Sequence, residues 1–346
     1  MINTNIDWLQ FSGFVDLVKL SDRQYFKINV CEFSTRHFKT VAEVLDTRQN
    51  KKIAVIAFKP HSNALPQNLI LVKIQNWLLY QNYLNQYIED FLNVFEIQFN
   101  NLTRVDICRD FQKLDYRNLK PQSFIKNFLR EKYIKVRKSK GQVYFNNGQN
   151  IDFQYLKFGS AKSRICSYLY NKTKELDEIE NKPYVREIWN QCGFIPANGD
   201  VWRCEFRLQN FDFLLTDTET GEQITYNGNV CGLQSLDIVN NCENLFNALA
   251  AHYLEFKKSD ENNDSNKSRK TSFYLFNQDK KNLFSRVYND NPEAGRAEKI
   301  FIKKLYTLNN ELRGTDHELS VYGETVLKRV IEAHELRTWA INKQYI

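Results

Sequence analysis

Residues 8–20 read WLQFSGFVDLVKL, and residues 25–33 read YFKINVCEF. Both stretches alternate apolar and polar side chains in short bursts, which is the pattern of β-strands that turn one face to a core. The segment from Asp7 to about Phe58 therefore predicts strands of an antiparallel sheet.

Farther along the chain, strands and helices follow one another without regular alternation. Strands are expected over 69–81, 104–111, 143–147, 153–159, 164–172 and 201–208, and helices over 85–97, over 121–134 and from about residue 173. A doubly wound parallel sheet would need strictly alternating strands and helices. The order instead predicts an α+β fold.

The character of the chain changes from about Ser235. Residues 236–256 have long helical spacing, residues 257–270 read KKSDENNDSNKSRK and contain almost no apolar side chains, and residues 297–312 and 323–343 are helical again. We expect one domain over 1–245 and a helical C-terminal region over 246–346, with a polar linker near 257–271.

Composition limits the class of protein. The chain has 346 residues, is 42% hydrophobic and 14% aromatic, and can bury a sizeable core. Its net charge of +7 favours a polyanionic partner. The seven cysteines form no C-x-x-C pair and are odd in number, which favours a reducing cytoplasm over zinc knuckles or a disulfide framework. Without a signal sequence or an apolar run near ~18 residues, we expect a cytoplasmic protein with no membrane partner.

Several common active-site motifs do not occur in the sequence. There is no G-x-x-x-x-G-K-[ST], no G-x-G-x-x-G and no G-x-S-x-G, and no two of the five histidines lie within four residues of each other. The sequence thus gives no support to a nucleotide-binding loop, a histidine-pair metal site or a serine hydrolase.

The predicted strand at 104–110 places acidic residues together. Because strands have a period of two, Arg104, Asp106, Cys108 and Asp110 share one face. Two carboxylates on one face repel each other, and a divalent cation would relieve that cost. A face that is simply solvated is the alternative interpretation.

The predicted strand at 202–208 has one charged and one apolar face. Arg203, Glu205 and Arg207 share a face, and the other face is apolar and belongs to a core. A plain surface row of ion pairs would give the same pattern.

The third candidate strand carries tyrosines beside a lysine. Tyr168, Tyr170 and Lys172 point one way along it. A phenol with a pKa of about 10 needs a nearby cation or base before it can act as a nucleophile. A tyrosine ladder on a sheet is the structural alternative.

Basic side chains supply a candidate nucleic-acid surface. One cluster surrounds Tyr133, a second closes the polar linker, and others lie on or near the strands described above. The candidates for DNA contact are Arg130, Lys132, Lys135, Arg137, Lys138 and Lys140, then Lys162, Arg164 and Arg203, with Lys267, Arg269 and Lys270 in the linker. A solvated charged face is the alternative.

Seven short motifs resemble those of the phage and plasmid replication initiation factors, the Rep_trans-like rolling-circle initiators, in the version found on elements of Bacteroidetes-type bacteria. They read IDWL at 6–9, NWLLY at 76–80, TRVDICRD at 103–110, GSAKS at 159–163, LYNKTKEL at 169–176, KPYVR at 182–186 and WRCE at 202–205. Each motif is short, and their common order makes the resemblance fairly specific.

The resemblance implies an α+β domain with antiparallel sheets, of replication-initiator type. It also implies a metal-dependent nickase that opens the origin of a plasmid or phage replicon, with Mg²⁺ or Mn²⁺ as cofactor. The metal ligands that it implies are Asp106, Asp110 and Glu205.

The resemblance implies Tyr170 as the nucleophile, with Lys172 beside it. Relatives often have an acidic residue between these two, where this chain has Asn171. Tyr168, on the same face, is the fallback nucleophile.

We therefore expect tyrosine transesterification on single-stranded or hairpin origin DNA, leaving a 5′-phosphotyrosyl link and a free 3′-OH. A host helicase or polymerase and a second copy of the chain are further candidate partners. One rival is a DNA-binding regulator of replication or transcription that keeps the scaffold without cutting. The other is a nuclease that uses water as the nucleophile.

Overall fold

The computed structural model describes the chain except for residues 1–2, 64, 138, 148–150, 161–162, 164, 210–212, 218–224, 227–228, 231–235, 260–270, 278–281, 287–295, 314–316 and 334–346. The chain forms two compact units, Met1–Arg286 and Val287–Ile346. The first unit thus extends beyond the boundary predicted at residue 245, which falls inside helix α6 (Cys242–Tyr253).

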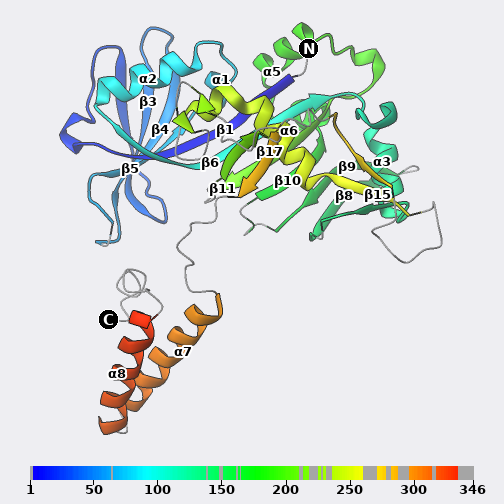
Figure 1. Ribbon diagram of the computed structural model, residues 1–346. Coiled ribbons are helices and arrows are strands. Elements are labelled where there is room, and N and C mark those ends of the chain that lie inside the picture. Colours follow the sequence, from blue (N-terminus) through cyan, green and yellow to red (C-terminus); the bar gives the residue numbers. More distant parts are fainter. Residues whose placement is uncertain are drawn as a thin grey trace. The chain divides into compact units, whose positions relative to one another are not determined.

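A ten-stranded antiparallel sheet dominates the first unit (Figure 1). Its strands, in spatial order, are β2 (Phe26–Cys31), β3 (Phe38–Asp46), β4 (Lys51–Pro60), β5 (Leu69–Ile74), β1 (Asn3–Phe14), β6 (Gln98–Phe111), β11 (Trp202–Gln209), β10 (Ile165–Asn171), β9 (Ile151–Phe158) and β8 (Gly141–Asn147). Helices accompany this sheet, so the predicted α+β class with antiparallel strands is confirmed.

Helices and smaller sheets complete the first unit. The helices besides α6 are α1 (Asn76–Leu79), α2 (Leu84–Phe95), α3 (Pro121–Leu129), α4 (Lys172–Glu178) and α5 (Pro183–Gln191). The small sheets join β16 (Ser272–Tyr274), β15 (Glu255–Lys258) and β7 (Tyr133–Lys135), then β12 (Phe213–Asp217) with β17 (Asn282–Arg286), and β13 (Thr225–Tyr226) with β14 (Asn229–Val230).

The strand predicted over 69–81 and the predicted polar linker differ from the structure. The strand expected over 69–81 ends at Ile74, because Trp77 turns back to donate a hydrogen bond of 2.7 Å to the Lys52 carbonyl, and the chain forms α1. The polar linker expected near 257–271 begins with β15, and its residues 260–270 lie outside the described residues.

One face of the central sheet is covered. The ring of Phe206 on β11 lies 5.4 Å from that of Phe246 on α6, and Phe158 on β9 contacts Phe128 on α3 and Phe256 on β15. The apolar face predicted for 202–208 is this covered face, since its alternate side chains are at most 3% exposed. Aromatic packing of this kind contributes both buried area and edge-to-face contacts.

The opposite face carries the charged side chains. Helices α1 and α5 meet beside it through the ring pair of Tyr80 and Tyr184 at 5.2 Å. Several polar residues of the central strands on this face are buried, including Asp106, Arg203 and Glu205.

The second unit contains two helices. Helices α7 (Arg296–Arg313) and α8 (His317–Ala333) pack around Ile302, Leu327 and Ile331. The helices predicted in this region are confirmed as far as Ala333. No helix in the part of the chain that the structure describes is long and apolar enough to cross a lipid bilayer.

Candidate functional site

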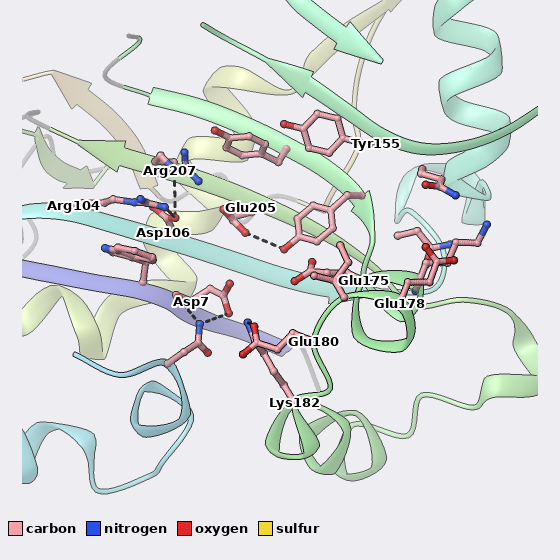
Figure 2. Close-up of a pocket in the computed structure, with 18 of the residues that line it drawn as sticks. Asp7, Arg104, Asp106, Tyr155, Glu175, Glu178, Glu180, Lys182, Glu205 and Arg207 are labelled. Atoms are coloured by element: carbon pink, nitrogen blue, oxygen red, sulfur yellow. Dashed lines mark hydrogen bonds and ion pairs between the residues drawn. The ribbon is translucent and has the colours of Figure 1, made fainter. Parts of the chain in front are cut away.

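A cavity of about 650 Å³ opens on the polar face of the central sheet (Figure 2). Its lining includes the carboxylates of Asp7, Asp106 and Glu205, the cations of Lys73, Arg104 and Arg207, and the rings of Tyr155, Tyr168 and Tyr170. Strands β1, β6, β11, β10 and β9 lie side by side and contribute most of these residues. The three strand segments that the sequence analysis identified therefore meet at one place.

A β-bulge brings Asp7 to the cavity. In the pairing of β1 with β6, Ile6 lies opposite Ile107 and Trp8 opposite Asp106, so Asp7 is an extra residue. An extra residue breaks the alternation of a strand and re-aims a side chain, and both Asp7 and Trp8 line the cavity. Asp7 was not among the residues predicted to form the site. One sign of the bulge was present in the sequence. The apolar residues Ile6, Leu9 and Phe11, which are buried, are three positions apart and then two.

Asp106 is paired with two arginines. Arg104 Nε donates a hydrogen bond of 2.9 Å to Asp106 Oδ1, a second Arg104 nitrogen contacts Oδ2, and Arg207 Nε lies 3.4 Å from Oδ2. The Asp106 side chain is 4% exposed. Asp106 lines the cavity as predicted, and the two guanidinium groups beside it give this end of the cavity a positive character (Figure 2).

Trp8 holds two of the cavity's cations in place. The Lys73 ammonium lies 3.5 Å from the centre of the Trp8 ring, and the Arg104 guanidinium carbon lies 3.9 Å from it. Such cation–π contacts fix flexible side chains without neutralising their charge. Burial and Arg104 lower the pKa of Lys73. This wall is suited to an anionic group such as a phosphate.

Asp110 and Arg203 form a buried ion pair outside the cavity lining. Arg203 Nε and Nη2 lie 2.6 and 2.8 Å from the two Asp110 oxygens, and Trp189 Nε1 donates a further bond of 2.7 Å to Oδ2. Arg203 Nη1 also lies 2.8 Å from Asp7 Oδ1. The arginine side chain is 0% exposed. The guanidinium is thus enclosed between Asp110 and Asp7, and the contact of Arg203 with DNA stays a prediction.

The same contacts account for Asp110. Both of its oxygens are occupied, and its side chain is 1% exposed. It orients Arg203 and is not directed toward the cavity. The role of Asp110 as a metal ligand stays a prediction. Arg203 in turn acts on Asp7: burial raises the pKa of Asp7, but Arg203, Lys172 and a hydrogen bond from Tyr80 outweigh burial and hold the pKa well below its usual range.

Tyr170 donates a hydrogen bond of 3.0 Å to Glu205 Oε2 (Figure 2). Burial, Asp106 and Asp7 raise the pKa of Glu205 to about 8, because a carboxylate in that position would add to a crowd of negative charge. Burial and Glu205 raise the pKa of Tyr170 well above its usual value. With a pKa of about 8, the Glu205 carboxyl holds its own proton at neutral pH, and it can accept the tyrosine proton only in its ionised form.

Lys172 lies over the ring of Tyr170, and its ammonium is paired with Glu175. It is the first residue of α4, is 1% exposed, and its ammonium lies 2.7 Å from Glu175 Oε1 and 5.5 Å from the centre of the Tyr170 ring. Burial of the ammonium excludes direct contact with a phosphate in this arrangement. Its influence on the site is electrostatic, through Asp7 and Glu205, whose pKa values it lowers.

Asn171 has a structural role at the turn from β10 to α4. Its side chain accepts a hydrogen bond of 3.1 Å from the Lys174 backbone nitrogen and donates one of 2.6 Å to Asp200 Oδ2. It is therefore the N-cap of α4. An acidic residue here would cap the helix equally well but would face the Asp200 carboxylate, which explains why an amide is accommodated at this position.

Tyr168 is the second tyrosine of the strand. Its ring is 8% exposed, with the Arg207 guanidinium 5.1 Å and the Lys157 ammonium 5.3 Å from the ring centre. Burial raises the pKa of Tyr168 to about 12. Unlike Tyr170, it is not hydrogen-bonded to Glu205.

The predicted basic cluster lies away from the cavity. Lys135 belongs to β7, in the small sheet that covers the opposite face, and burial and Arg137 lower its pKa to about 8. Lys132, Arg137 and Lys140 are exposed nearby in the sequence. Lys138, Lys162 and Arg164, and the linker residues Lys267, Arg269 and Lys270, lie outside the described residues.

The donor chemistry of the cavity suits a hard divalent cation. Asp106 and Glu205, with Asp7 nearby, supply the carboxylate oxygens that Mg²⁺ and Mn²⁺ prefer. Within the described residues, no three His, Cys, Asp or Glu side chains lie close enough to hold one ion. Two carboxylates suffice where substrate phosphates and water complete the coordination, as is usual for Mg²⁺.

No protein-family model matches the chain, and no curated protein matches it. Among solved structures, the chain is similar to the rolling circle replication initiator protein from Geobacillus stearothermophilus, with 14% sequence identity and a TM-score of 0.44, over 78% of this chain and 92% of that one. A likeness of this strength assigns neither a fold nor a function to the chain.

Proposed function

We propose that the protein is a replication initiator that cuts one strand of origin DNA with Tyr170 to start rolling-circle replication of a plasmid or phage. The observation that carries the proposal is the hydrogen bond of 3.0 Å from the Tyr170 hydroxyl to Glu205. This pair lines a cavity that also contains Lys73, Arg104 and Arg207. A nucleophile, a proton acceptor and an anion-binding wall are the parts that phosphoryl transfer requires.

In the proposed reaction, the Tyr170 oxygen attacks the phosphorus of one phosphodiester. Its proton passes to the ionised form of Glu205, the bond to the 3′-oxygen breaks, and that oxygen takes a proton from water. The products are a 5′-phosphotyrosyl link and a 3′-OH that host polymerase extends. Arg104 and Arg207 are placed to stabilise the charge of the phosphate. Water as nucleophile would release the 5′ end, whereas the tyrosyl link conserves the bond for later rejoining.

A divalent cation forms part of the proposal. Asp106 and Glu205 would hold Mg²⁺ or Mn²⁺, which would supply Lewis-acid polarisation of a phosphate oxygen. Glu205 has two oxygens, and only Oε2 accepts the hydrogen bond from Tyr170 that defines the pair. Asp7 lines the same cavity and is a further candidate carboxylate ligand.

The test uses circular single-stranded DNA of the replicon that encodes the chain, with Mg²⁺ or Mn²⁺, on a denaturing gel. We expect linear DNA with protein attached at the 5′ end, lost in EDTA and in Tyr170→Phe. Tyr168→Phe, which removes a hydroxyl two residues away on the same strand face, is the matched control and should still form the adduct. An adduct lost only in Tyr168→Phe would transfer the nucleophile role to that residue.

A non-cutting DNA-binding protein is the second candidate, and a specific observation favours it. The pKa of Tyr170 is raised well above its usual value, and the ammonium of Lys172 is paired with Glu175. The raised pKa of Tyr170 and the pairing of Lys172 both work against a reactive phenolate. Intact circles with ordinary binding shifts would support this candidate, and cleavage without a protein-linked end would support a nuclease that uses water.

A further inference from the structure

A row of tyrosines leads from the edge of the sheet to the cavity. Tyr144 on the edge strand β8 lies opposite Tyr155 on β9, and Tyr155 lies opposite Tyr170 on β10. Cross-strand partners share a face of the sheet, so all three rings are on the side of the cavity. The Tyr144 and Tyr155 ring centres are 5.3 Å apart, and Tyr155 lies 5.9 Å from Tyr168.

The outer end of this row is open to solvent. The Tyr144 side chain is 60% exposed, so its ring is accessible to a partner. Tyr155 is partly buried and lines the cavity (Figure 2). The exposed ring is thus continuous, through Tyr155, with the candidate nucleophile.

A second β-bulge lies beside the row. Tyr144 pairs with Tyr155 and Phe145 pairs with Phe153, which leaves Gln154 as an extra residue of β9. Gln154 therefore lines the cavity together with Tyr155. Its amide nitrogen Nε2 is buried and has no hydrogen-bond partner among the described residues. A buried donor without a partner carries a cost that a ligand acceptor would remove.

The charge around the row fits a nucleic-acid strand. The Lys157 ammonium and the Arg207 guanidinium lie over the Tyr168 ring, at 5.3 and 5.1 Å from its centre. Aromatic rings interleaved with cations are the combination that binds unpaired strands, because bases stack on the rings while the cations face phosphates. Paired bases hide their faces in the duplex and cannot use such a surface.

We infer that Tyr144 and Tyr155 form a stacking platform for unpaired bases of the DNA strand that enters the cavity, and that Gln154 Nε2 donates to a base edge there. The inference rests on the proposed function for the position of the scissile phosphate at Tyr170. It adds the residues that would hold the bases of an unpaired strand, on the side of β8 and β9. Stacking is tolerant of sequence, so the platform contributes affinity for single strands and not recognition of an origin.

The test measures fluorescence anisotropy of two labelled oligomers with the full chain. One is a twelve-residue oligo(dT), and the other is an abasic phosphodiester of the same length and charge. We expect wild type to prefer oligo(dT) and Tyr144→Ala to lose about five- to tenfold in affinity for it, as removal of one stacking ring does. Affinity for the abasic oligomer should not change.

Three comparisons make the test specific. Tyr144→Phe keeps the ring and should bind as wild type does. Tyr83→Ala removes a tyrosine that is 41% exposed on another surface and should also bind normally. Gln154→Leu should weaken oligo(dT) binding and leave the abasic oligomer unaffected. Equal affinity of wild type for both oligomers, or equal loss of both in Tyr144→Ala, would overturn the inference.

The adduct assay with circular DNA separates this inference from the proposed function. A base preference that depends on Tyr144 without any covalent adduct would keep the platform and refute the nicking reaction. A normal adduct together with unchanged oligo(dT) binding by Tyr144→Ala would keep the reaction and refute the platform.

Discussion

Replacing Glu205 by Gln should change how the stability of the protein depends on pH. Glu205 is 7% exposed, and burial with Asp106 and Asp7 raises its pKa from the ordinary 4.5 to about 8. Between these values the unfolded chain has lost the proton and the folded chain keeps it. Deprotonation in this window therefore stabilises only the unfolded chain, and the free energy of unfolding falls as pH rises.

The magnitude follows from the width of the window. The contribution of Glu205 is fully present below pH 4.5, falls by about 1.4 kcal/mol per pH unit, and is lost above about pH 8, a total of at most about 5 kcal/mol. Glutamine has nearly the same shape and can accept the Tyr170 hydrogen bond, but it does not ionise. Glu205→Gln should therefore gain stability relative to wild type steadily from pH 5 to pH 8, with no further gain above that.

Urea unfolding from pH 5 to pH 9 in EDTA measures this difference. Tryptophan fluorescence is a suitable signal, because Trp8, Trp77, Trp189 and Trp202 all lie in the first compact unit. The contributions of other titrating groups to the pH dependence are the same in both proteins and cancel in the difference. The reasoning is refuted if the difference in free energy of unfolding stays constant with pH, or if the variant becomes less stable relative to wild type as pH rises. Either result would show that Glu205 is ionised in the folded chain.

Three further results follow from the same contacts. Mn²⁺ should raise the melting temperature of wild type at pH 8 and have a much smaller effect on Glu205→Gln, because ions that bind only the folded chain stabilise it; an equal shift in both would exclude Glu205 as a ligand. Asp110→Asn should lower the free energy of unfolding in EDTA by about 3–5 kcal/mol, because it leaves a buried guanidinium without its carboxylate; a loss seen only when divalent metal is present would restore the ligand role. Asn171→Asp should cost about 1 kcal/mol at pH 7 through repulsion from Asp200, and melting at pH 4 should recover most of it; equal destabilisation at both pH values would show that charge is not the cause.

The period of two in single strands predicted which face each side chain occupies. Asp106 and Asp110 share a face of β6, and Glu205 faces the same side from β11, as expected. Sharing a face does not mean sharing an environment, because residues four apart in a strand are separated by about 13 Å. Arg207 lies opposite Asp106, whereas Arg203 lies opposite Asp110. The order and register of the strands decided this, and no single strand contains that information.

The role of Lys172 was predicted on the assumption that it belongs to the strand. Strand β10 ends one residue earlier, at Asn171. Asn171 caps a helix that starts at Lys172, so the lysine leaves the plane of the sheet and finds Glu175 one helical turn later. The cap signal was present in the sequence, since Asn is among the preferred N-cap residues and Glu175 falls in the first turn. The predicted helix start at about 173 placed the turn correctly but left Lys172 on the strand.

The two β-bulges explain why the cavity can hold more polar groups than a regular sheet allows. A regular strand presents every second residue to one face, and the intervening residues must face the core. On β1 the extra residue is Asp7, and on β9 it is Gln154, so each strand sends two successive side chains into the cavity. One bulge adds a carboxylate on the side of the cations, and the other adds an amide on the side of the tyrosine row. The buried residues on either side keep their alternation, so the core is preserved while the chemistry of the open face is enriched.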